Sequence, residues 1–283
     1  MKRPQDINIQ EFDYELPDHR IAKFPVEPRE KCKLLHFNDR EITHHTFEEI
    51  TQRLDEQDLL VMNNARVINA RLKFQKPTGG KVEIFVLEPH EQTPDEALKN
   101  VGSTVWKCMV GGAKKWKEGA VKLEEQLAAC PHLEATLVQR EPHFLVEFSW
   151  ATNITWGEIL DEAGKIPLPP YLNRNSEASD AEDYQTVYAQ QPGSVAAPTA
   201  GLHFSENLLE KLNRNGVRTA QLTLHVGAGT FKPVSSETLG GHDMHRELVD
   251  IDRNTIQAVV DAPSVIAVGT TAMRSLESAY WLG

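Results

Sequence analysis

Four short polar segments of this sequence carry side chains that could do chemistry, and they lie at the ends of expected strands. They are residues 63–66, 198–204, 224–231 and 268–274. Between them they hold His203, His225, Thr230, Arg66 and Arg274. Ligands bind at strand ends in α/β sheets, and a helix N-terminus offers free N–H groups to an electron-rich or anionic ligand. The four segments together predict one binding site.

Several common kinds of site are missing from the pattern. The sequence has no GxxxxGK[ST] phosphate loop, no GxSxG nucleophile turn and no HExxH zinc helix. Lys232 stands where a dinucleotide fingerprint beginning at Gly227 needs its third glycine. His242, His245 and Glu247 could hold zinc, but they have no thiol partners and follow an irregular glycine loop. We therefore expect acid–base use of these side chains and no bound metal.

Helix starts and strands alternate on both sides of the middle of the chain. Capping residues predict helix starts at four positions: Thr46, Thr155, Ser205 and Asn254. Residues 59–62 and 265–268 are continuous apolar runs, as in strands covered on both faces. Residues 220–226 alternate apolar and polar side chains, as in a strand buried on one face. This alternation of elements predicts a layered α/β domain.

The middle of the chain has a different pattern. Strand-like runs separated by glycine-containing turns occupy residues 81–87, 105–110, 133–138 and 144–150. One short helical stretch, residues 118–129, interrupts them. We expect a small all-β barrel inserted in an α/β chain. Residues 1–69 and 151–283 would then form a discontinuous α/β catalytic domain, and residues 70–150 an inserted β-barrel domain.

Composition limits the function further. The net charge of −11 argues against indiscriminate nucleic-acid binding, yet residues 66–81 and 106–117 carry basic side chains and no acidic one. A polyanion could bind there if the two segments are adjacent in space; otherwise they are ordinary solvated loops.

Cysteine content and hydropathy bear on where the chain resides. Three scattered cysteines, Cys32, Cys108 and Cys130, suggest reduced, buried thiols. We find no apolar run that could cross a bilayer and no secretory signal in residues 1–10, and we expect a cytoplasmic monomer.

Taken in order, the segments resemble one family along nearly the whole chain. The resemblance rests on Ala196-Ala-Pro-Thr-Ala-Gly-Leu-His-Phe204, on Leu224-His-Val-Gly-Ala-Gly-Thr-Phe-Lys-Pro-Val234 and on six further stretches: Phe12–Ala22, Leu60–Leu72, Gly164–Tyr171, Asp183–Tyr188, His242–Glu247 and Gly269–Arg274. It is the family of S-adenosylmethionine:tRNA ribosyltransferase-isomerases of queuosine biosynthesis.

The resemblance implies both a fold and a reaction. The fold is an α/β domain with an inserted β-barrel. The reaction transfers and isomerises the ribosyl part of S-adenosylmethionine onto 7-aminomethyl-7-deazaguanine at the tRNA wobble position. The products are epoxyqueuosine-tRNA, adenine and methionine, so S-adenosylmethionine is a consumed substrate and no cofactor is needed. Family members usually continue well past the position of Gly283, so the resemblance also predicts a chain shortened at its C-terminus.

Site residues follow from this chemistry, which needs a base beside the sulfonium, an acid for the departing adenine and a docking surface for RNA. We expect acid–base catalysis from His203, His225, His245 and Glu247, with the individual roles open. We expect substrate binding by Asn63, Arg66, Thr199, Gly201, Gly227, Gly229, Thr230, Thr270 and Arg274. We expect phosphate contacts from Arg71, Lys114 and Lys115.

Two other function classes stay open at this point. A non-catalytic RNA-binding module would explain the basic segments and the barrel, but not the polar strand ends. An S-adenosylmethionine-dependent RNA methyltransferase would need a glycine-rich fingerprint after an early strand, and that strand ends in Asn63-Asn64.

Overall fold

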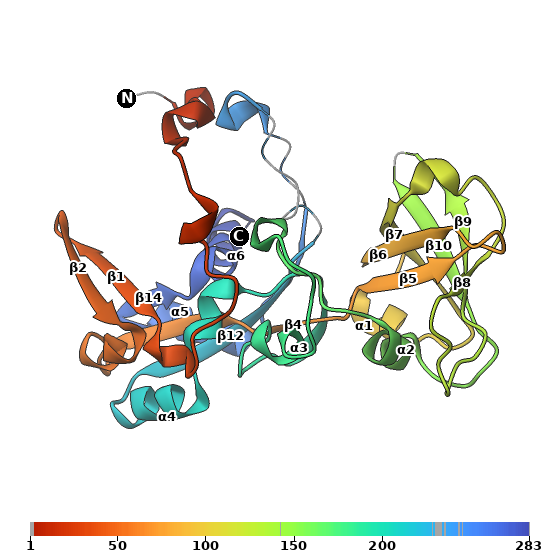
Figure 1. Cartoon of the computed structure of the whole chain (residues 1–283). Coiled ribbons are helices and arrows are strands. Elements are labelled where there is room, and N and C mark those ends of the chain that lie inside the picture. The colour runs from red at the N-terminus through yellow and green to blue at the C-terminus, as the bar shows by residue number, and fades with distance from the viewer. Residues whose placement is uncertain are drawn as a thin grey trace.

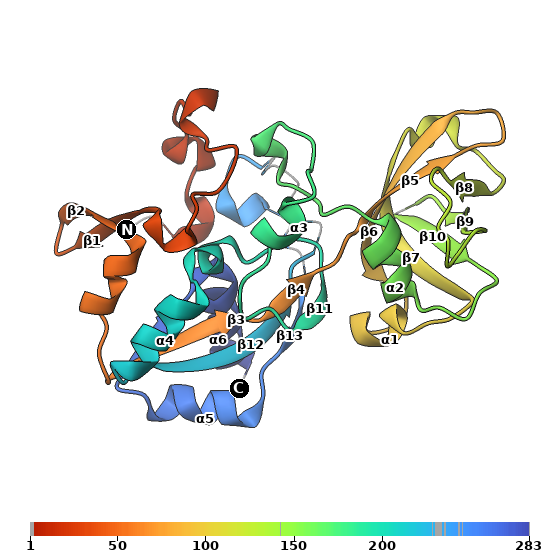
Figure 2. The same cartoon turned by 60° about the horizontal axis from the view of Figure 1, so that its bottom comes forward.

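The computed structural model describes residues 3–141, 143–227, 229, 234, 236–242, 244 and 246–282, with Pro4 and Lys115 described by their backbone alone. An α/β part and a closed β-barrel lie at opposite ends of the molecule (Figure 1). Two chain segments join them and run side by side (Figure 2). In these segments Arg71 and Lys165 exchange two backbone hydrogen bonds, of 3.1 and 2.9 Å. The predicted fold class, a layered α/β domain with an inserted barrel, is confirmed.

The α/β part is built on a four-stranded sheet of order β13-β12-β3-β14. Strand β3 (Asp58–Asn63) lies in the middle and is parallel to both β12 (Arg218–His225) and β14 (Ser264–Ala267). Strand β13 (Leu248–Asp250) pairs antiparallel with the C-terminal end of β12. The ends of β3 and β12 therefore meet at one edge of the sheet, as expected for the predicted site.

The apolar run in β3 faces two separate cores. Leu60 and Met62 pack with helix α4 (Glu206–Arg214) and the 3-10 helix η5 (Phe47–Gln52) on one face of the sheet. Leu59 and Val61 pack against helices α5 (Arg253–Asp261) and α6 (Gly269–Leu282) on the other face. Successive side chains of a strand point to opposite faces, so a strand covered on both sides must be apolar throughout. The prediction for residues 59–62 is confirmed.

The helices begin close to the predicted capping residues. The α-helices are α1 (Pro94–Leu98), α2 (Trp156–Ala163), α3 (Asp180–Asp183), α4 (Glu206–Arg214), α5 (Arg253–Asp261) and α6 (Gly269–Leu282). The 3-10 helices are η1 (Pro4–Asp6), η2 (Ile9–Phe12), η3 (Asp18–Arg20), η4 (Arg29–Lys31), η5 (Phe47–Gln52), η6 (Ala113–Lys115), η7 (Pro170–Leu172), η8 (Thr199–His203) and η10 (Leu239–Gly241). The capping box at Thr155 starts α2, whereas the one at Thr46 starts only η5. Asp252, and not Asn254, caps α5.

Two small sheets complete the α/β part. Strand β4 (Ala65–Val67) pairs in parallel with β11 (Gln191–Ser194) next to the connection to the barrel. Strands β1 (Lys33–Asn38) and β2 (Glu41–Thr46) form an antiparallel hairpin that projects from the body (Figure 1).

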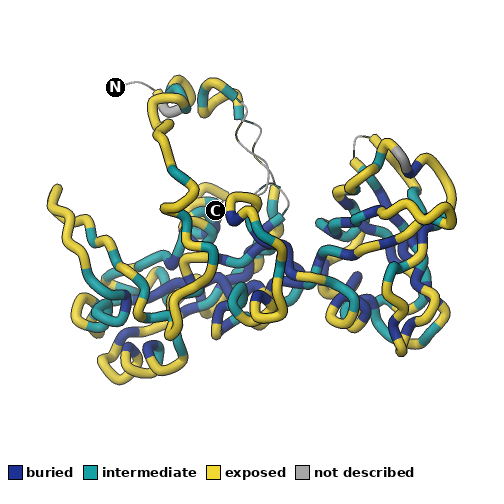
Figure 3. Tube along the Cα trace, in the orientation of Figure 1, coloured by how far each residue is buried: buried dark blue, intermediate teal, exposed yellow. Residues whose placement is uncertain are grey.

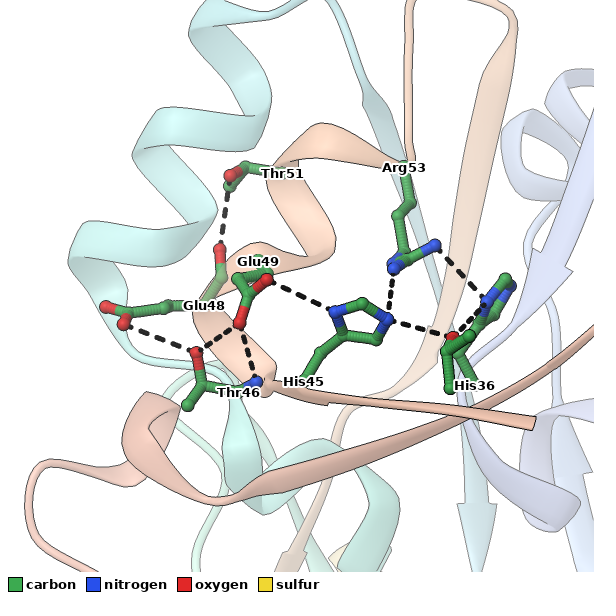
Figure 4. Close-up of polar contacts among 8 residues, drawn as sticks. His36, His45, Thr46, Glu48, Glu49, Thr51 and Arg53 are labelled. Carbon is green, nitrogen blue, oxygen red and sulfur yellow. Dashed lines mark hydrogen bonds and ion pairs between the residues drawn. The ribbon is translucent and has the colours of Figure 1, made fainter.

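Polar contacts fasten this hairpin to η5 (Figure 4). Glu49 accepts a hydrogen bond of 2.9 Å from the Thr46 backbone, and its other carboxylate oxygen lies 3.2 Å from Nδ1 of His45. Arg53 donates to Nε2 of His45, so in the neutral ring Nδ1 carries the proton that reaches Glu49. The base of the hairpin is therefore held in one orientation relative to η5.

The barrel closes in the order β10-β7-β6-β5-β8-β9, with every pair antiparallel. Its strands are β5 (Arg71–Gln75), β6 (Lys81–Pro89), β7 (Ser103–Gly111), β8 (Val121–Leu123), β9 (Glu134–Gln139) and β10 (Phe144–Ser149). The predicted helix over residues 118–129 is wrong. Val121 is buried in the barrel and β8 joins β5 to β9, so barrel closure overrides the local helical pattern.

The core of the barrel continues into α2. Trp156 is fully buried, and its ring centroid lies 4.5 Å from that of Phe148 and 5.8 Å from that of Trp150. Buried residues accordingly fill the barrel end as well as the central sheet (Figure 3). A domain boundary at residue 150 thus cuts between α2 and the barrel residues on which it packs; the division into domains itself stays a prediction.

Candidate active site

His203 lies in a cavity of about 450 Å³, called here the His203 pocket, where η8 meets η4 and the segment around α3. Its lining includes Cys32, Tyr171, Asp183, Tyr184, Thr199 and His203. The Cys32 Sγ lies 3.1 Å from Nδ1 of His203, and the Phe47 ring centroid is 5.5 Å from the imidazole centroid. Burial lowers the pKa of His203, with a smaller contribution from the positive charge of Arg29. The imidazole is therefore neutral at pH 7.

His225, the last residue of β12, lies in a second cavity of about 370 Å³, the His225 pocket, between the sheet edge and the barrel. Its lining includes Glu88, Pro94, Gly193, Gly227, Arg246 and Glu247. Burial lowers the pKa of His225, while the negative charge of Asp250 opposes that shift. Its buried Nδ1 has no hydrogen-bond partner among the residues that the structure describes.

Gly193 on β11 leaves room for this ring. A Cβ at Gly193 would lie 3.0 Å from Nδ1 of His225 and 2.5 Å from the Cβ of Pro94, and the glycine has a φ of +133°. A larger residue would meet both a steric clash and an unfavourable backbone conformation. Gly193 therefore fixes where the imidazole can sit.

Glu247 joins the His225 pocket to α6. One carboxylate oxygen accepts a 3.0 Å hydrogen bond from the Gly227 N–H, and the other lies 2.6 Å from Nη1 of Arg274. The Glu247 side chain is 10% exposed and that of Arg274 is 40% exposed. The predicted catalytic carboxylate and the predicted substrate-binding Arg274 thus form one ion pair.

A third cavity, of about 320 Å³, lies at the N-terminus of α6 and is called here the helix pocket. Its lining includes Tyr184, Pro198, Thr199, Gly269, Thr270 and Thr271. The Oγ1 of Thr271 is buried and has no partner within the described part of the chain. Gly269 has a φ of +86°, and a Cβ there would lie 2.9 Å from that of Ala200, so only glycine lets α6 start so close to η8.

The three cavities share walls. Thr199 and Tyr184 line both the His203 pocket and the helix pocket, and Val226 lines both the helix pocket and the His225 pocket. The structure therefore brings Thr199 and Thr270 together between the two histidines. His203 and His225 lie in different pockets, with the helix pocket between them.

The remaining predicted residues differ in their surroundings. Asn63 is fully buried, and within the described residues its amide bonds backbone groups: it donates to the Leu224 carbonyl and accepts from the N–H groups of Leu224 and Ala65. Because it links β3 to β12 from inside the fold, we do not retain Asn63 as a substrate-binding residue. Gly201 is buried against Tyr188, whose hydroxyl would lie 1.9 Å from a Cβ at that position, so it too serves packing.

Arg66 is exposed on β4, and Gly229 is half-buried. His245 and Thr230 lie outside the described residues, as does the side chain of Lys115. The roles predicted for these five residues stay predictions.

The basic segments contribute Arg71 to β5 and Lys107 to β7, which β6 separates in the barrel, and carboxylates of β6 pair with both side chains. Arg71 on β5 lies 2.8 Å from Glu83 on β6, and Lys107 on β7 lies 3.0 Å from Glu88. Lys114 is exposed on η6. These carboxylate partners could not be recognised from the charges within each segment, because residues paired across a barrel are distant in the chain.

Arg71 also lines the largest of these cavities, about 770 Å³, which we call the barrel cleft. It lies between the outer face of the barrel and the proline-rich segment, and its lining includes Arg71, Phe85, Met109, Phe144, Pro170 and Arg174. Pro167, Pro169 and Pro170 line both this cleft and the helix pocket. The proline segment therefore separates the barrel cleft from the helix pocket.

The sequence analysis did not predict that Cys32 and Thr271 belong to the site. Cys108 and Cys130 are buried free thiols as predicted, whereas Cys32 is half-buried and lies beside His203. A cysteine and a histidine so far apart in the chain give no local signal. Thr271 could have been found, since it directly follows Thr270 at a predicted helix start.

Metal ligands and membrane-spanning helices can be assessed for the described residues. No cluster of three or more His, Cys, Asp or Glu side chains there is arranged to hold a metal ion. Every helix there is too short or too polar to span a lipid bilayer.

Comparison with known proteins gives two matches. The solved structure of an S-adenosylmethionine tRNA ribosyltransferase from Thermotoga maritima is 28% identical in sequence, and the match covers 96% of this chain and 74% of that chain with a TM-score of 0.41. A family model described as queuosine biosynthesis protein matches residues 9–282. That match spans the α/β part and the barrel together. The chain therefore belongs to the queuosine biosynthesis protein family.

Proposed function

We propose that this protein transfers and isomerises the ribosyl moiety of S-adenosylmethionine onto 7-aminomethyl-7-deazaguanine at the tRNA wobble position. The products are epoxyqueuosine-tRNA, adenine and methionine. S-adenosylmethionine is consumed as a substrate, and the proposed reaction uses no cofactor.

One observation carries the proposal: a chain of the queuosine biosynthesis family has two neutral histidines on either side of a pocket lined by threonines. Neutral imidazoles can accept or donate protons near pH 7. The hydroxyls of Thr199, Thr270 and Thr271 offer hydrogen bonds to a nucleoside, and the start of α6 favours electron-rich groups. In this proposal the helix pocket holds the nucleoside part of S-adenosylmethionine.

The His225 pocket is suited to proton removal beside the sulfonium. His225 is neutral, and Glu247 brings a carboxylate into the same cavity. A carboxylate near the site stabilises the positive charge that the imidazole acquires with the proton. Arg274 holds Glu247 by the 2.6 Å contact, so its expected role changes from direct substrate binding to orienting this carboxylate.

The barrel cleft is where we place the RNA strand next to the modified nucleotide. Phe85, Met109 and Phe144 provide apolar surface on which bases could stack, and Arg71 lies at the same cleft. Exposed Lys114 on η6 is available to phosphates, and a phosphate contact from Lys115 stays a prediction. The proline wall shared with the helix pocket would let two substrates approach each other.

Incubation with tRNA and S-adenosylmethionine tests the function directly. One preparation of S-adenosylmethionine carries a ribose label and the other a methyl label. The proposal predicts ribose label in tRNA and free adenine, with the methyl label released as methionine. Methyl label in tRNA would instead identify a methyltransferase, and tRNA binding without either transfer would identify a binding module.

Single substitutions to alanine at His203, His225 and His245 test the acid–base set. We expect adenine release to fall by about 10²- to 10⁴-fold where a histidine transfers a proton. His132→Ala, on an exposed barrel residue, is the matched control and should leave the rate unchanged. Three unimpaired variants would remove the histidines from the mechanism.

A further inference from the structure

The thiol of Cys32 and the imidazole of His203 meet inside the His203 pocket although 171 positions separate them in the sequence. The Sγ–Nδ1 distance is 3.1 Å, within hydrogen-bonding range for sulfur. Cys32 has so far been given no part in the reaction. The contact uses one ring nitrogen of His203 and leaves Nε2 as the nitrogen through which His203 can meet a ligand.

Two sets of contacts hold Cys32 in this position. Its carbonyl accepts a 2.9 Å hydrogen bond from the Phe47 N–H, which closes the base of the β1–β2 hairpin, and the Phe47 ring packs on His203. Just before Cys32, Arg29 donates to the carbonyls of Gln185 and Glu182, at 2.6 and 2.7 Å. Hairpin and η4 thus fix the thiol against the imidazole (Figure 4 shows the polar contacts that hold the hairpin base).

The protonation states of Cys32 and His203 determine which of the two groups donates the hydrogen bond. Burial raises the pKa of the Cys32 thiol, and burial together with Arg29 lowers the pKa of His203. Both groups are therefore neutral at pH 7, and a thiolate–imidazolium pair is disfavoured. A thiol S–H is a weak donor and its sulfur a weak acceptor, whereas an imidazole nitrogen lone pair is a good acceptor. The S–H of Cys32 then donates to Nδ1.

We propose that Cys32 is a positioning residue that fixes His203 in the tautomer with its proton on Nε2. His203 then meets its ligand as a hydrogen-bond donor and not as a base. A hydrogen bond from a neutral imidazole requires no buried positive charge. The identity of the acceptor rests on the proposed function: it is a nitrogen of the departing adenine, while proton removal falls to His225.

Long-range ¹H–¹⁵N spectra of the ¹⁵N-histidine-labelled protein report the tautomer without any turnover. His203→Gln assigns the signal. We expect the proton of His203 on Nε2, the nitrogen that does not face Cys32. A His203 with its proton on Nδ1, or doubly protonated at pH 7, overturns the inference.

Variants at Cys32 connect the tautomer with the rate. Cys32→Ala should give a mixture of His203 tautomers and a kcat lower by about tenfold, with the KM for tRNA unchanged. Cys32→Ser keeps a donor and should restore a single tautomer and most of the rate. Cys130→Ala in the barrel is the matched control, and neither the tautomer nor kcat should change.

An unchanged tautomer and rate in Cys32→Ala also overturns the inference. Failure of the proposed function is distinguishable from this result. A wild-type protein that releases no adenine with S-adenosylmethionine and tRNA contradicts that function, whereas the spectra still decide the tautomer.

Discussion

The His203 pocket and the His225 pocket contain imidazoles that have lost basicity for the same reason but differ in what they contact. Burial lowers both pKa values. In the His203 pocket, Nδ1 is 3.1 Å from the Cys32 thiol. In the His225 pocket, Nδ1 is buried against Gly193 with no partner among the described residues. One ring is oriented by a hydrogen bond and the other by sterics.

This difference suggests a division of labour. A buried polar atom without a partner costs roughly 1–3 kcal/mol, and such atoms in native structures call for an explanation. The negative charge of Asp250 acts on His225 and favours an imidazolium there, whereas the charge that acts on His203 is the positive one of Arg29. We therefore infer that His225 accepts a proton and that His203 donates a hydrogen bond.

The largest expected effect separates the two histidines. His225→Gln removes the base and should lower kcat for adenine release by about 10³-fold. His203→Gln keeps an amide donor and should lower kcat by about tenfold. Single-turnover rates with saturating tRNA measure both. Equal losses in the two variants would contradict the division of labour.

Gly193→Ala tests whether sterics hold His225. The new Cβ clashes with Pro94 and the ring at a φ of +133°, so we expect about 2 kcal/mol less stability and about tenfold slower turnover. Gly102→Ala is the control, because Gly102 also has a positive φ of +86° but open space around it. Gly193→Ala should have a lower free energy of unfolding in urea and a slower turnover than Gly102→Ala. Equal turnover would show that Gly193 does not position His225.

The two pockets also predict a pH dependence of stability. The folded pKa of each histidine lies below the ordinary 6.5, so below that pH the unfolded chain binds more protons and the free energy of unfolding falls. Above about pH 7 this contribution is constant. Denaturant titrations at several pH values between 5 and 8 measure the free energy of unfolding. In the double variant His203→Gln, His225→Gln this free energy should change less with pH than in the wild-type protein. An unchanged pH dependence would mean that neither ring is protected from protonation.

The smallest effect is expected at the barrel, away from both pockets. Lys114→Ala should weaken tRNA binding modestly and reduce the slope of log K against log salt concentration by about 0.7, the loss of one phosphate contact with a single strand. Arg214→Ala, an exposed cation on α4, is the control. Binding titrations at several salt concentrations measure the slope. Identical slopes in both variants would remove Lys114 from the RNA surface.

Features set by local sequence were predictable. The apolar run of β3, the capping boxes at Thr46 and Thr155 and the alternation of apolar residues in β12 each follow from spacing within a few residues. The strand ends likewise indicated where a site could lie. The family resemblance, which covers nearly the whole chain, agrees with the match over residues 9–282.

Features set by contacts between distant segments were not predictable. β8 forms because the barrel needs a strand between β5 and β9, against a local helical pattern. Asn63 looked like a ligand-binding residue until its hydrogen bonds to Leu224 on β12 were seen. The same holds for Cys32, whose partner His203 belongs to another element.

We propose ribosyl transfer in a site built from these two pockets. Its most direct test measures free adenine and ribose label in tRNA in one reaction with the full chain. Ribosyl transfer predicts that both appear in a 1:1 ratio, that both need tRNA, and that His225→Gln slows both together. Adenine release that is independent of tRNA, or methyl label in the tRNA, would contradict it.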